Sequence, residues 1–336
     1  MHDRLKKSGV AGLAVTVLVA LAWLLYRQAP AEPRALDRIR VAAPSLHHCS
    51  LVFIAFEKGY FREAGIEVVV KPAGHGLEAA QLMAEGDADL AIASEIVFVT
   101  TTLKRPGLAM VANVYSSADS LAVVARRDRA IARPRDLAGK RVGVTMRTSA
   151  EYFLATFLIR NEMPADAITL VDVAPNDVVR RLADGEIDAA SIWEPFATQA
   201  GEVLGEGASI FHSGDGYVET MVVFGEGAFI RAHPSALQGF VAAVLRAEHF
   251  ARKRPEEALR LVAEHVGVRP EKLRPLWDPG SLKVTLTQPQ LSSMEDEARW
   301  AMSRGYAETR PVPNFLPNMH LDALAAAAPQ RVTVAR

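Results

Sequence analysis

Apolar positions along the chain form short continuous runs that alternate with stretches of helical periodicity. Runs at residues 39–43, 66–70 and 90–93 predict strands, and the segments at 51–63 and 77–84 between them predict helices. Continuous apolar runs are typical of parallel strands that helices cover on both faces. The pattern therefore predicts a βαβαβ unit in the first part of the chain.

The same order of elements occurs a second time. Strands are predicted at residues 141–145, 168–172 and 189–192, and helices at 149–161 and 177–183. The second set repeats the order and the approximate lengths of the first. The fold class predicted is therefore α/β, with two lobes that each contain a βαβαβ parallel-sheet unit.

One short phrase is present in both units. Residues 83–95 read Met-Ala-Glu-Gly-Asp-Ala-Asp-Leu-Ala-Ile-Ala-Ser-Glu, and residues 182–194 read Leu-Ala-Asp-Gly-Glu-Ile-Asp-Ala-Ala-Ser-Ile-Trp-Glu. Each copy predicts a helix end, a glycine in the left-handed conformation, an acidic turn and a strand. Ligands of open α/β sheets bind beyond the carboxyl ends of strands. The polar pairs at these two strand ends are thus candidate ligand-binding residues: Ser94-Glu95 and Trp193-Glu194.

Two further strands indicate how the units are joined. One is predicted at residues 121–125 and a return strand at 220–224, so the chain crosses twice between the lobes and forms a hinge. We expect lobe I to comprise residues 35–120 and 219–336, and lobe II residues 121–218. Amphipathic helices are expected to wrap lobe I, at residues 234–252, 255–265 and 288–304.

Composition narrows the set of partners. The 336 residues carry a formal net charge of −1, and no basic tract follows the N-terminal region, so nucleic acid is not an expected partner. The single Cys49 permits no internal disulfide and no zinc-ribbon spacing.

The N-terminal region has the pattern of an export signal. Arg4, Lys6 and Lys7 precede an unbroken apolar run at residues 10–26. We expect residues 1–34 to be a signal peptide, or an N-terminal membrane anchor, plus a linker. The rest of the chain is then periplasmic or otherwise outside the cytoplasm, and residues 10–26 tether it to the inner membrane if they are not cleaved.

Four phrases resemble one family in their order and spacing. They are Phe56-Glu-Lys-Gly-Tyr-Phe-Arg-Glu-Ala-Gly-Ile66, Gly86-Asp-Ala-Asp-Leu-Ala-Ile92, Val142-Gly-Val-Thr145 with Thr148-Ser-Ala-Glu-Tyr-Phe153, and Trp193-Glu-Pro-Phe196. The chain resembles the periplasmic solute-binding proteins of ABC importers, in the group that binds sulfonates, taurine, nitrate and thiamine-precursor pyrimidines. The resemblance implies a type II periplasmic binding protein fold that closes on a small-molecule ligand and docks on an ABC permease and its ATPase subunit. It implies a monomer and no cofactor.

The start of the predicted helix at 149–161 is a candidate anion site. Thr148 and Glu151 have capping-box spacing, in which Thr148 bonds the amide of Glu151. The remaining first-turn amides, the helix dipole and the Ser149 hydroxyl are suited to an anionic group of a ligand. Thr145 ends the preceding strand. Arg147 replaces a glycine of the resembling family and puts a cationic group near the cleft.

Histidines follow the first two predicted strands. His47, His48 and Ser50 follow the first strand, and His75 follows the second, where the resembling family has Gly-Ser. Adjacent histidines rarely converge on one ion and the regular ligand spacings are absent, so no metal site is predicted. Hydrogen-bond donation to a ligand and a solvated loop both stay open, and a protonated His75 would strengthen an anion site.

The strand-end pairs also have two interpretations each. Trp193 is expected to be a stacking wall of the cleft, with core packing as the alternative. Glu194 suits a ligand amine or a salt bridge to the opposite lobe, which argues for a zwitterion or a polar organic ligand. Glu95 holds the equivalent place in lobe I, where it can also be an ordinary helix-start acid.

Motifs of enzymatic chemistry are absent from the sequence. It contains no Gly-x-Ser-x-Gly elbow, no phosphate-binding glycine-rich loop and no His-Glu-x-x-His, so no catalytic residue is predicted. The expected function is solute binding for an ABC importer, with a sulfonate, taurine or nitrate-like cargo. The alternatives are a same-fold enzyme of thiamine-pyrimidine or menaquinone biosynthesis, and a membrane-anchored ligand-sensing domain.

Overall fold

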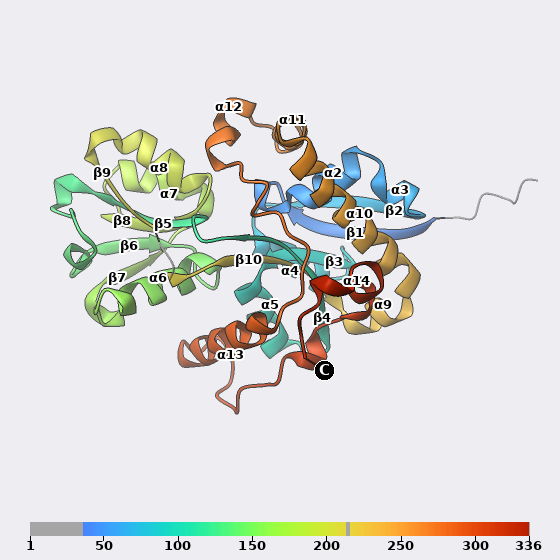
Figure 1. Ribbon diagram of the computed structural model, residues 1–336. Coiled ribbons are helices and arrows are strands. Elements are labelled where there is room, and N and C mark those ends of the chain that lie inside the picture. Colours follow the sequence, from blue (N-terminus) through green and yellow to red (C-terminus); the bar gives the residue numbers. More distant parts are fainter. Residues whose placement is uncertain (1–35, 213–215, 336) are drawn as a thin grey trace, which may run out of the picture. The chain divides into compact units, whose positions relative to one another are not determined.

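The computed structural model describes residues 36–212 and 216–335. Residues 37–336 form one compact unit, shown in Figure 1. The predicted signal peptide or anchor at residues 1–34, with its apolar run at 10–26, lies outside the described residues. Across the part of the chain that is described, no helix is both long and apolar enough to cross a membrane.

The first sheet has five strands in the order β2-β1-β3-β10-β4. Strand β1 pairs in parallel with β2 and β3, whereas β10 runs antiparallel between β3 and β4. The three runs predicted as parallel strands in the first unit are confirmed. The bounds are β1 (Asp37–Pro44), β2 (Ile66–Ala73), β3 (Leu90–Ser94), β4 (Leu108–Ser117) and β10 (Glu219–Glu226).

Helices cover this sheet and complete lobe I. The crossover helices are α2 (Ser50–Glu57), α3 (Tyr60–Glu63), α4 (Gly76–Ala84) and α5 (Glu95–Lys104). Helix α10 packs against α2 and α14, and α13 packs against α5, as Figure 1 shows. The C-terminal helices are α9 (Gly227–Ala232), α10 (Pro234–Lys253), α11 (Pro255–His265), α12 (Pro270–Leu273), α13 (Gln288–Ser303) and α14 (Asp322–Ala327).

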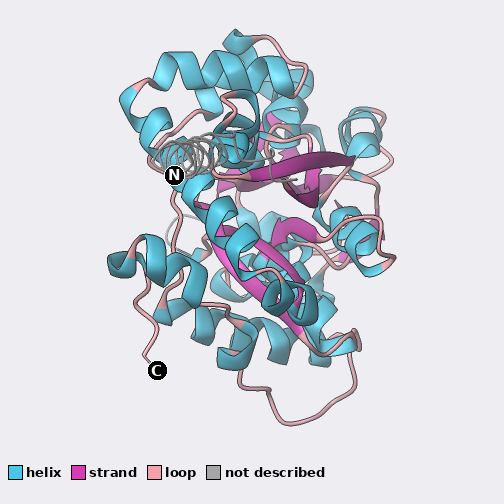
Figure 2. Cartoon of the chain, turned by 90° about the vertical axis from the view of Figure 1, so that its right-hand side faces the viewer, coloured by secondary structure: helices cyan, strands magenta, loops and turns pink. Residues whose placement is uncertain are grey.

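The second sheet also has five strands, in the order β7-β6-β8-β5-β9. Strand β6 pairs in parallel with β7 and β8, and β5 runs antiparallel to β8 and β9. The bounds are β5 (Leu121–Arg126), β6 (Arg141–Val144), β7 (Thr169–Asp172), β8 (Ala189–Trp193) and β9 (Ala208–His212). The helices of this lobe II are α6 (Ser149–Arg160), α7 (Val178–Ala183) and α8 (Phe196–Leu204). In the molecule as a whole, helices lie on the outside of the strands, as Figure 2 shows by colour.

The chain crosses between the lobes twice, as the sequence predicts. It leaves the first sheet after β4 and returns to it at β10, after β9. Each sheet is surrounded by its own apolar core, so the lobes have separate interiors joined by two short segments. A two-lobed α/β fold with a hinge is therefore confirmed.

The helix predicted at residues 51–63 is two helices. Gly59 adopts the left-handed conformation, with φ of 71°, between α2 and α3. A backbone that turns left-handed cannot continue an α-helix, and glycine takes this conformation without a Cβ clash.

The last aspartate of the duplicated phrase has the same role in both lobes. Asp89 accepts hydrogen bonds from the backbone N–H of Arg40 at 2.7 Å and from its Nη2 at 2.6 Å. Asp188 accepts from the backbone N–H of Arg141 at 2.9 Å and from its Nη2 at 2.8 Å. Each pair ties the start of the third strand of its unit to the first strand, which explains why the phrase recurs.

We expect Asp188→Asn to lower the free energy of unfolding by about 1–2 kcal/mol at pH 7, a modest value because Arg141 is half-exposed and solvent screens the pair. The hydrogen bond with Arg141 lowers the pKa of Asp188, so its contribution is present above pH 3.8 and is lost as pH falls through the depressed pKa. Urea denaturation at pH 7 and pH 3 measures this change. Asp184→Asn, which alters an exposed ion pair with Arg180, is the control. A loss that is equal at both pH values would contradict the role of the charge.

Candidate functional site

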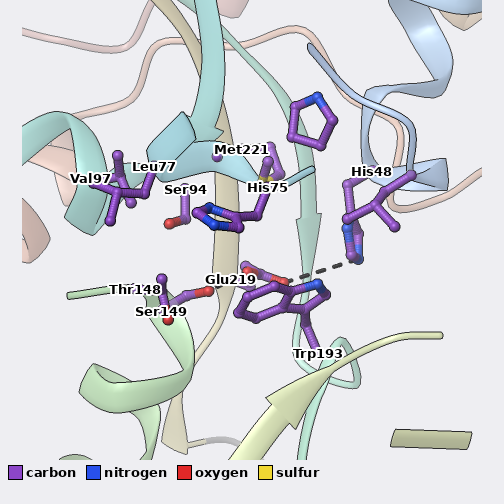
Figure 3. A pocket seen from close by; sticks show the side chains of 13 residues that line it. His48, His75, Leu77, Ser94, Val97, Thr148, Ser149, Trp193, Glu219 and Met221 are labelled. Atoms are coloured by element: carbon purple, nitrogen blue, oxygen red, sulfur yellow. Dashed lines mark hydrogen bonds and ion pairs between the residues drawn. The ribbon is translucent and has the colours of Figure 1, made fainter. Parts of the chain in front are cut away.

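A small cavity lies between the lobes, at the carboxyl ends of their parallel strands. The space inside measures about 30 Å³, enough for roughly two water molecules. A larger molecule can enter only if the lobes separate or the lining side chains move. The lining residues, ten of which are labelled in Figure 3, are Pro44, Leu46, His48, His75, Gly76, Leu77, Ser94, Val97, Thr148, Ser149, Trp193, Glu219 and Met221.

Glu219 supplies the only carboxylate among these lining residues. It is the first residue of β10, and its side chain is 3% exposed. Its Oε1 accepts a hydrogen bond from Ser149 Oγ at 2.6 Å, and its Oε2 accepts one from Ser120 Oγ. His48 Nε2 lies 4.0 Å from Oε2, the contact drawn as a dashed line in Figure 3. Burial raises the pKa of Glu219, and the two hydroxyl donors oppose that rise.

The histidines of the cavity are neutral at pH 7. Burial lowers the pKa of His48 well below its ordinary value, with a smaller effect of His47 in the same direction. Burial also lowers the pKa of His75. No lysine or arginine is among the lining residues, so no permanent cation of the wall faces Glu219.

Trp193 forms the lobe II wall opposite the histidines. The side chain is 5% exposed and packs in the core of lobe II, so the wall and the core interpretations hold together. Its Nε1–H is buried and has no hydrogen-bond partner. A buried donor left without a partner costs about 1–3 kcal/mol, which an acceptor on a ligand would relieve.

The first turn of α6 differs from the prediction. Thr148 does not cap the helix through its side chain, because its hydroxyl donates instead to the carbonyl of Thr145 at 2.7 Å. Glu151 accepts from the backbone N–H of Arg147 at 2.7 Å rather than from that of Thr148. The prediction of a capping box at Thr148 and Glu151 is therefore wrong.

Arg147 has a left-handed backbone conformation, which favours glycine, and the resembling family has a glycine at this position. Its φ is 63°, a conformation that costs a residue with a Cβ roughly 1–2 kcal/mol. Its side chain is exposed and does not line the cavity, so the structure does not bring this cation to the site.

Of the twelve residues predicted for the site, half line the cavity. These are His48, His75, Ser94, Thr148, Ser149 and Trp193. The other six do not: His47, Ser50, Glu95, Thr145, Arg147 and Glu194. His47 instead lines a larger neighbouring groove of about 380 Å³, which shares Leu46 with the cavity.

Most of the residues outside the cavity have local roles. Glu194 accepts from the backbone N–H of Thr198 at 3.0 Å and so caps α8. The Thr145 hydroxyl donates to the carbonyl of Val173 at 2.8 Å, and the Ser50 hydroxyl donates to the carbonyl of His47.

Glu95 points into the packing of α5 on α13. It accepts a hydrogen bond from Gln290 Nε2 at 3.2 Å and is 3% exposed. Burial raises its pKa to about 7. Glu297 of α13 is buried as well, and burial together with the charge of Glu95 raises its pKa. These two carboxyls form an acidic pair between α5 and α13, near Tyr152 of α6, and do not line the cavity.

Glu219 and Ser120 are the polar residues that sequence reasoning missed. Glu219 is the first residue of the return strand β10 and Ser120 directly precedes β5, so both lie where the chain crosses between the lobes. The sequence signal for Glu219 is a single acidic residue directly before the apolar return strand predicted at residues 220–224. The pairing with Ser149 joins residues far apart in the chain and has no sequence signature.

Ion pairs join the lobes on both sides of the cavity. Arg304 Nη2 lies 3.0 Å from Glu151 Oε1, and the Tyr306 hydroxyl donates to the same carboxylate at 2.8 Å. On the other side, Lys272 Nζ lies 2.9 Å from Glu202 Oε1. The described structure is therefore a closed arrangement of the lobes.

The described residues form no site for a metal ion or for a reactive thiolate. Within residues 36–212 and 216–335, no three His, Cys, Asp or Glu side chains gather to hold an ion. Cys49 is fully buried outside the cavity lining, and burial raises its pKa, which disfavours a thiolate.

Two lobes with mixed sheets, a double crossing and a cavity at the strand ends define the class of two-lobed periplasmic binding protein folds. Within it, the chain belongs to the NMT1/THI5-like family, whose model matches residues 47–258.

Relatives and solved structures agree with this class. A protein of Brucella abortus (strain 2308) with the provisional name of a binding protein is 24% identical over 222 residues, which are 65% of this chain and 68% of that protein. The taurine-binding periplasmic protein of Escherichia coli (strain K12) is 22% identical over 56% of this chain and 59% of its own. The periplasmic aliphatic sulphonate binding protein SsuA from Escherichia coli superposes with a TM-score of 0.71 at 14% identity, over 82% of this chain and 95% of SsuA.

An enzyme has the same fold. The desulfurization enzyme DSZB matches with a TM-score of 0.64 at 19% identity, over 88% of this chain and 99% of the enzyme. The fold alone therefore does not separate binding from catalysis.

The buried Glu95 should make stability depend on pH. A carboxyl whose pKa rises from 4.5 to about 7 on folding stabilises the protein in acid, and this contribution is lost as pH rises from about 4.5 to 7. The loss due to Glu95 should be on the order of 3 kcal/mol, and Glu95→Gln should remove this part of the pH dependence while the part due to Glu297 remains. Urea denaturation at pH 5 and pH 7.5 measures the difference. The exposed Glu85→Gln is the control, and an unchanged profile in Glu95→Gln would contradict the assignment.

Proposed function

We propose that the protein is the solute-binding component of an ABC importer. It captures a small polar organic molecule between its lobes and delivers it to a membrane permease that works with an ATPase subunit. The observation that carries this proposal is the cavity between the lobes at the strand ends, where Trp193 presents a buried donor without a partner. Membership of the NMT1/THI5-like family and the names of the relatives support it.

The mechanism is a shift of population between open and closed lobes. A cargo that contacts both walls of the cavity favours the closed state by its differential affinity for that state. The permease then recognises the closed shape. No covalent step is needed, and one chain suffices for the cycle, so a monomer is the proposed working form.

We place the protein in the periplasm. The E. coli relatives are periplasmic by name, and the N-terminal pattern of a basic start and an apolar run is that of an export signal. Residues 10–26 are the proposed inner-membrane tether where they are retained. The proposed lobe boundaries stay at residues 35–120 and 219–336 for lobe I and 121–218 for lobe II.

A ligand screen tests the proposed function. The full chain is heated with sulfonates, taurine, nitrate, pyrimidines and aromatic acids. A ligand at a hundred times its Kd should add about 2.7 kcal/mol to the free energy of unfolding and raise the Tm. If no compound raises the Tm, and one of them is chemically converted on incubation, the same-fold enzyme replaces the binding protein.

Trp193→Phe should weaken binding with little effect on the ligand-free protein. The substitution keeps an aromatic ring in the core but removes the Nε1–H, so cargo affinity should fall about 3- to 10-fold. The Tm without ligand should change little, because the loss of packing is offset by removal of the unpartnered donor. Calorimetric titration with the screened ligand measures the affinity.

Trp277→Phe is the matched control for this variant. Trp277 also has a buried Nε1–H without a partner, but it does not line the cavity. Its substitution should leave affinity unchanged. An equal loss of affinity in both variants would contradict a direct role of Trp193.

A further inference from the structure

The position expected for an anionic ligand is occupied by the protein's own carboxylate. The Ser149 hydroxyl, at the first turn of α6, donates to Glu219 Oε1 at 2.6 Å. The hydroxyl at this helix start therefore already stabilises a negative charge. An anion from solution would have to displace Glu219 or lie beside it.

The residues that line the cavity include no cationic side chain to offset a second negative charge. Its lining contains no lysine or arginine, and burial keeps His48 and His75 neutral at pH 7. The exposed Arg147 does not reach the lining. A free anion next to Glu219 would thus meet a like charge in a small, largely buried space.

The hydrogen-bond inventory leaves acceptor capacity on Glu219. Ser149 and Ser120 each have one hydroxyl proton and give it to this carboxylate. Ser120 Oγ also lies 3.0 Å from His48 Nε2, and since its own proton is used, His48 is the donor in that contact. A carboxylate has about four lone-pair sites, so Glu219 can accept further N–H donors from a cargo.

We propose that Glu219 selects a cargo that presents an N–H donor or a positive charge, and that it excludes simple anions such as nitrate and unsubstituted alkanesulfonates. This inference rests on the proposed function and names the chemical class of its cargo. Trp193 Nε1 adds one donor on the lobe II wall, so a matching cargo combines an N–H group for Glu219 with an acceptor for Trp193. Aminated heterocycles and amino-substituted acids meet both conditions.

Two pairs of matched probes test the selection in the full wild-type chain. Taurine and ethanesulfonate differ by one ammonium group, and 4-aminopyrimidine and pyrimidine differ by one amino group. Calorimetric titration at pH 8 should show at least tenfold tighter binding of the amino member in one of the pairs. Nitrate should not compete with that member.

Glu219→Gln tests the role of the carboxylate itself. The amide has nearly the same shape, but it lacks the charge. It also keeps a single acceptor oxygen, so one of the two serine hydroxyls must turn and accept from the amide NH2 instead. The preference for the amino member should fall about 10- to 100-fold, the range for a hydrogen bond to a charged group. Binding of ethanesulfonate should become tighter. Glu194→Gln, which changes a buried carboxyl that caps α8 outside the cavity, should leave the preference intact.

The outcomes separate the two proposals. Ethanesulfonate or nitrate binding to the wild type as tightly as the amino probes would overturn the charge selection and leave the solute-binding function in place. An unchanged preference in a folded Glu219→Gln would overturn the role of Glu219 alone. Failure of every probe to bind, with chemical conversion of one of them, would overturn both. The probe pairs decide the selection in the wild type even if the variant does not fold.

Discussion

A buried carboxylate at the hinge is the constraint on which the closed structure depends. Glu219 stands where the chain re-enters lobe I, and its two hydroxyl donors come from the first crossing and from the first turn of α6 in lobe II. A charge that loses its water must be hydrogen-bonded within the protein. In this structure the Ser120 and Ser149 hydroxyls take the place of water at Glu219. One side chain therefore contacts both the first crossing segment and lobe II.

The closed state combines stabilising contacts with unmet hydrogen bonds. Ion pairs such as that of Glu151 with Arg304 hold the rims together, while the indole N–H of Trp193 stays without a partner inside. Such a balance suits a protein whose closure must wait for cargo, because an unsatisfied cavity wall keeps the empty closed state from becoming too stable.

The fold by itself serves more than one function. A sulphonate-binding protein and a desulfurization enzyme share its architecture, so the fold does not decide between binding and catalysis. Here the cavity lining contains hydroxyls, neutral imidazoles, an indole and one carboxylate, whereas Cys49 is buried outside it with a raised pKa. This set of groups can bind and orient a polar molecule through hydrogen bonds and ring contacts.

The pattern of apolar and polar residues along the sequence was sufficient to predict the architecture. Continuous apolar runs and the duplicated phrase predicted both sheets, because parallel strands need burial on both faces and because Asp89 and Asp188 perform the same local task in each unit. Only the tertiary structure decided the site. It turned Glu95 into the packing of α13, and it joined Glu219 to Ser149. Such pairings depend on how two lobes, far apart in the sequence, close on each other, and no local spacing encodes that geometry.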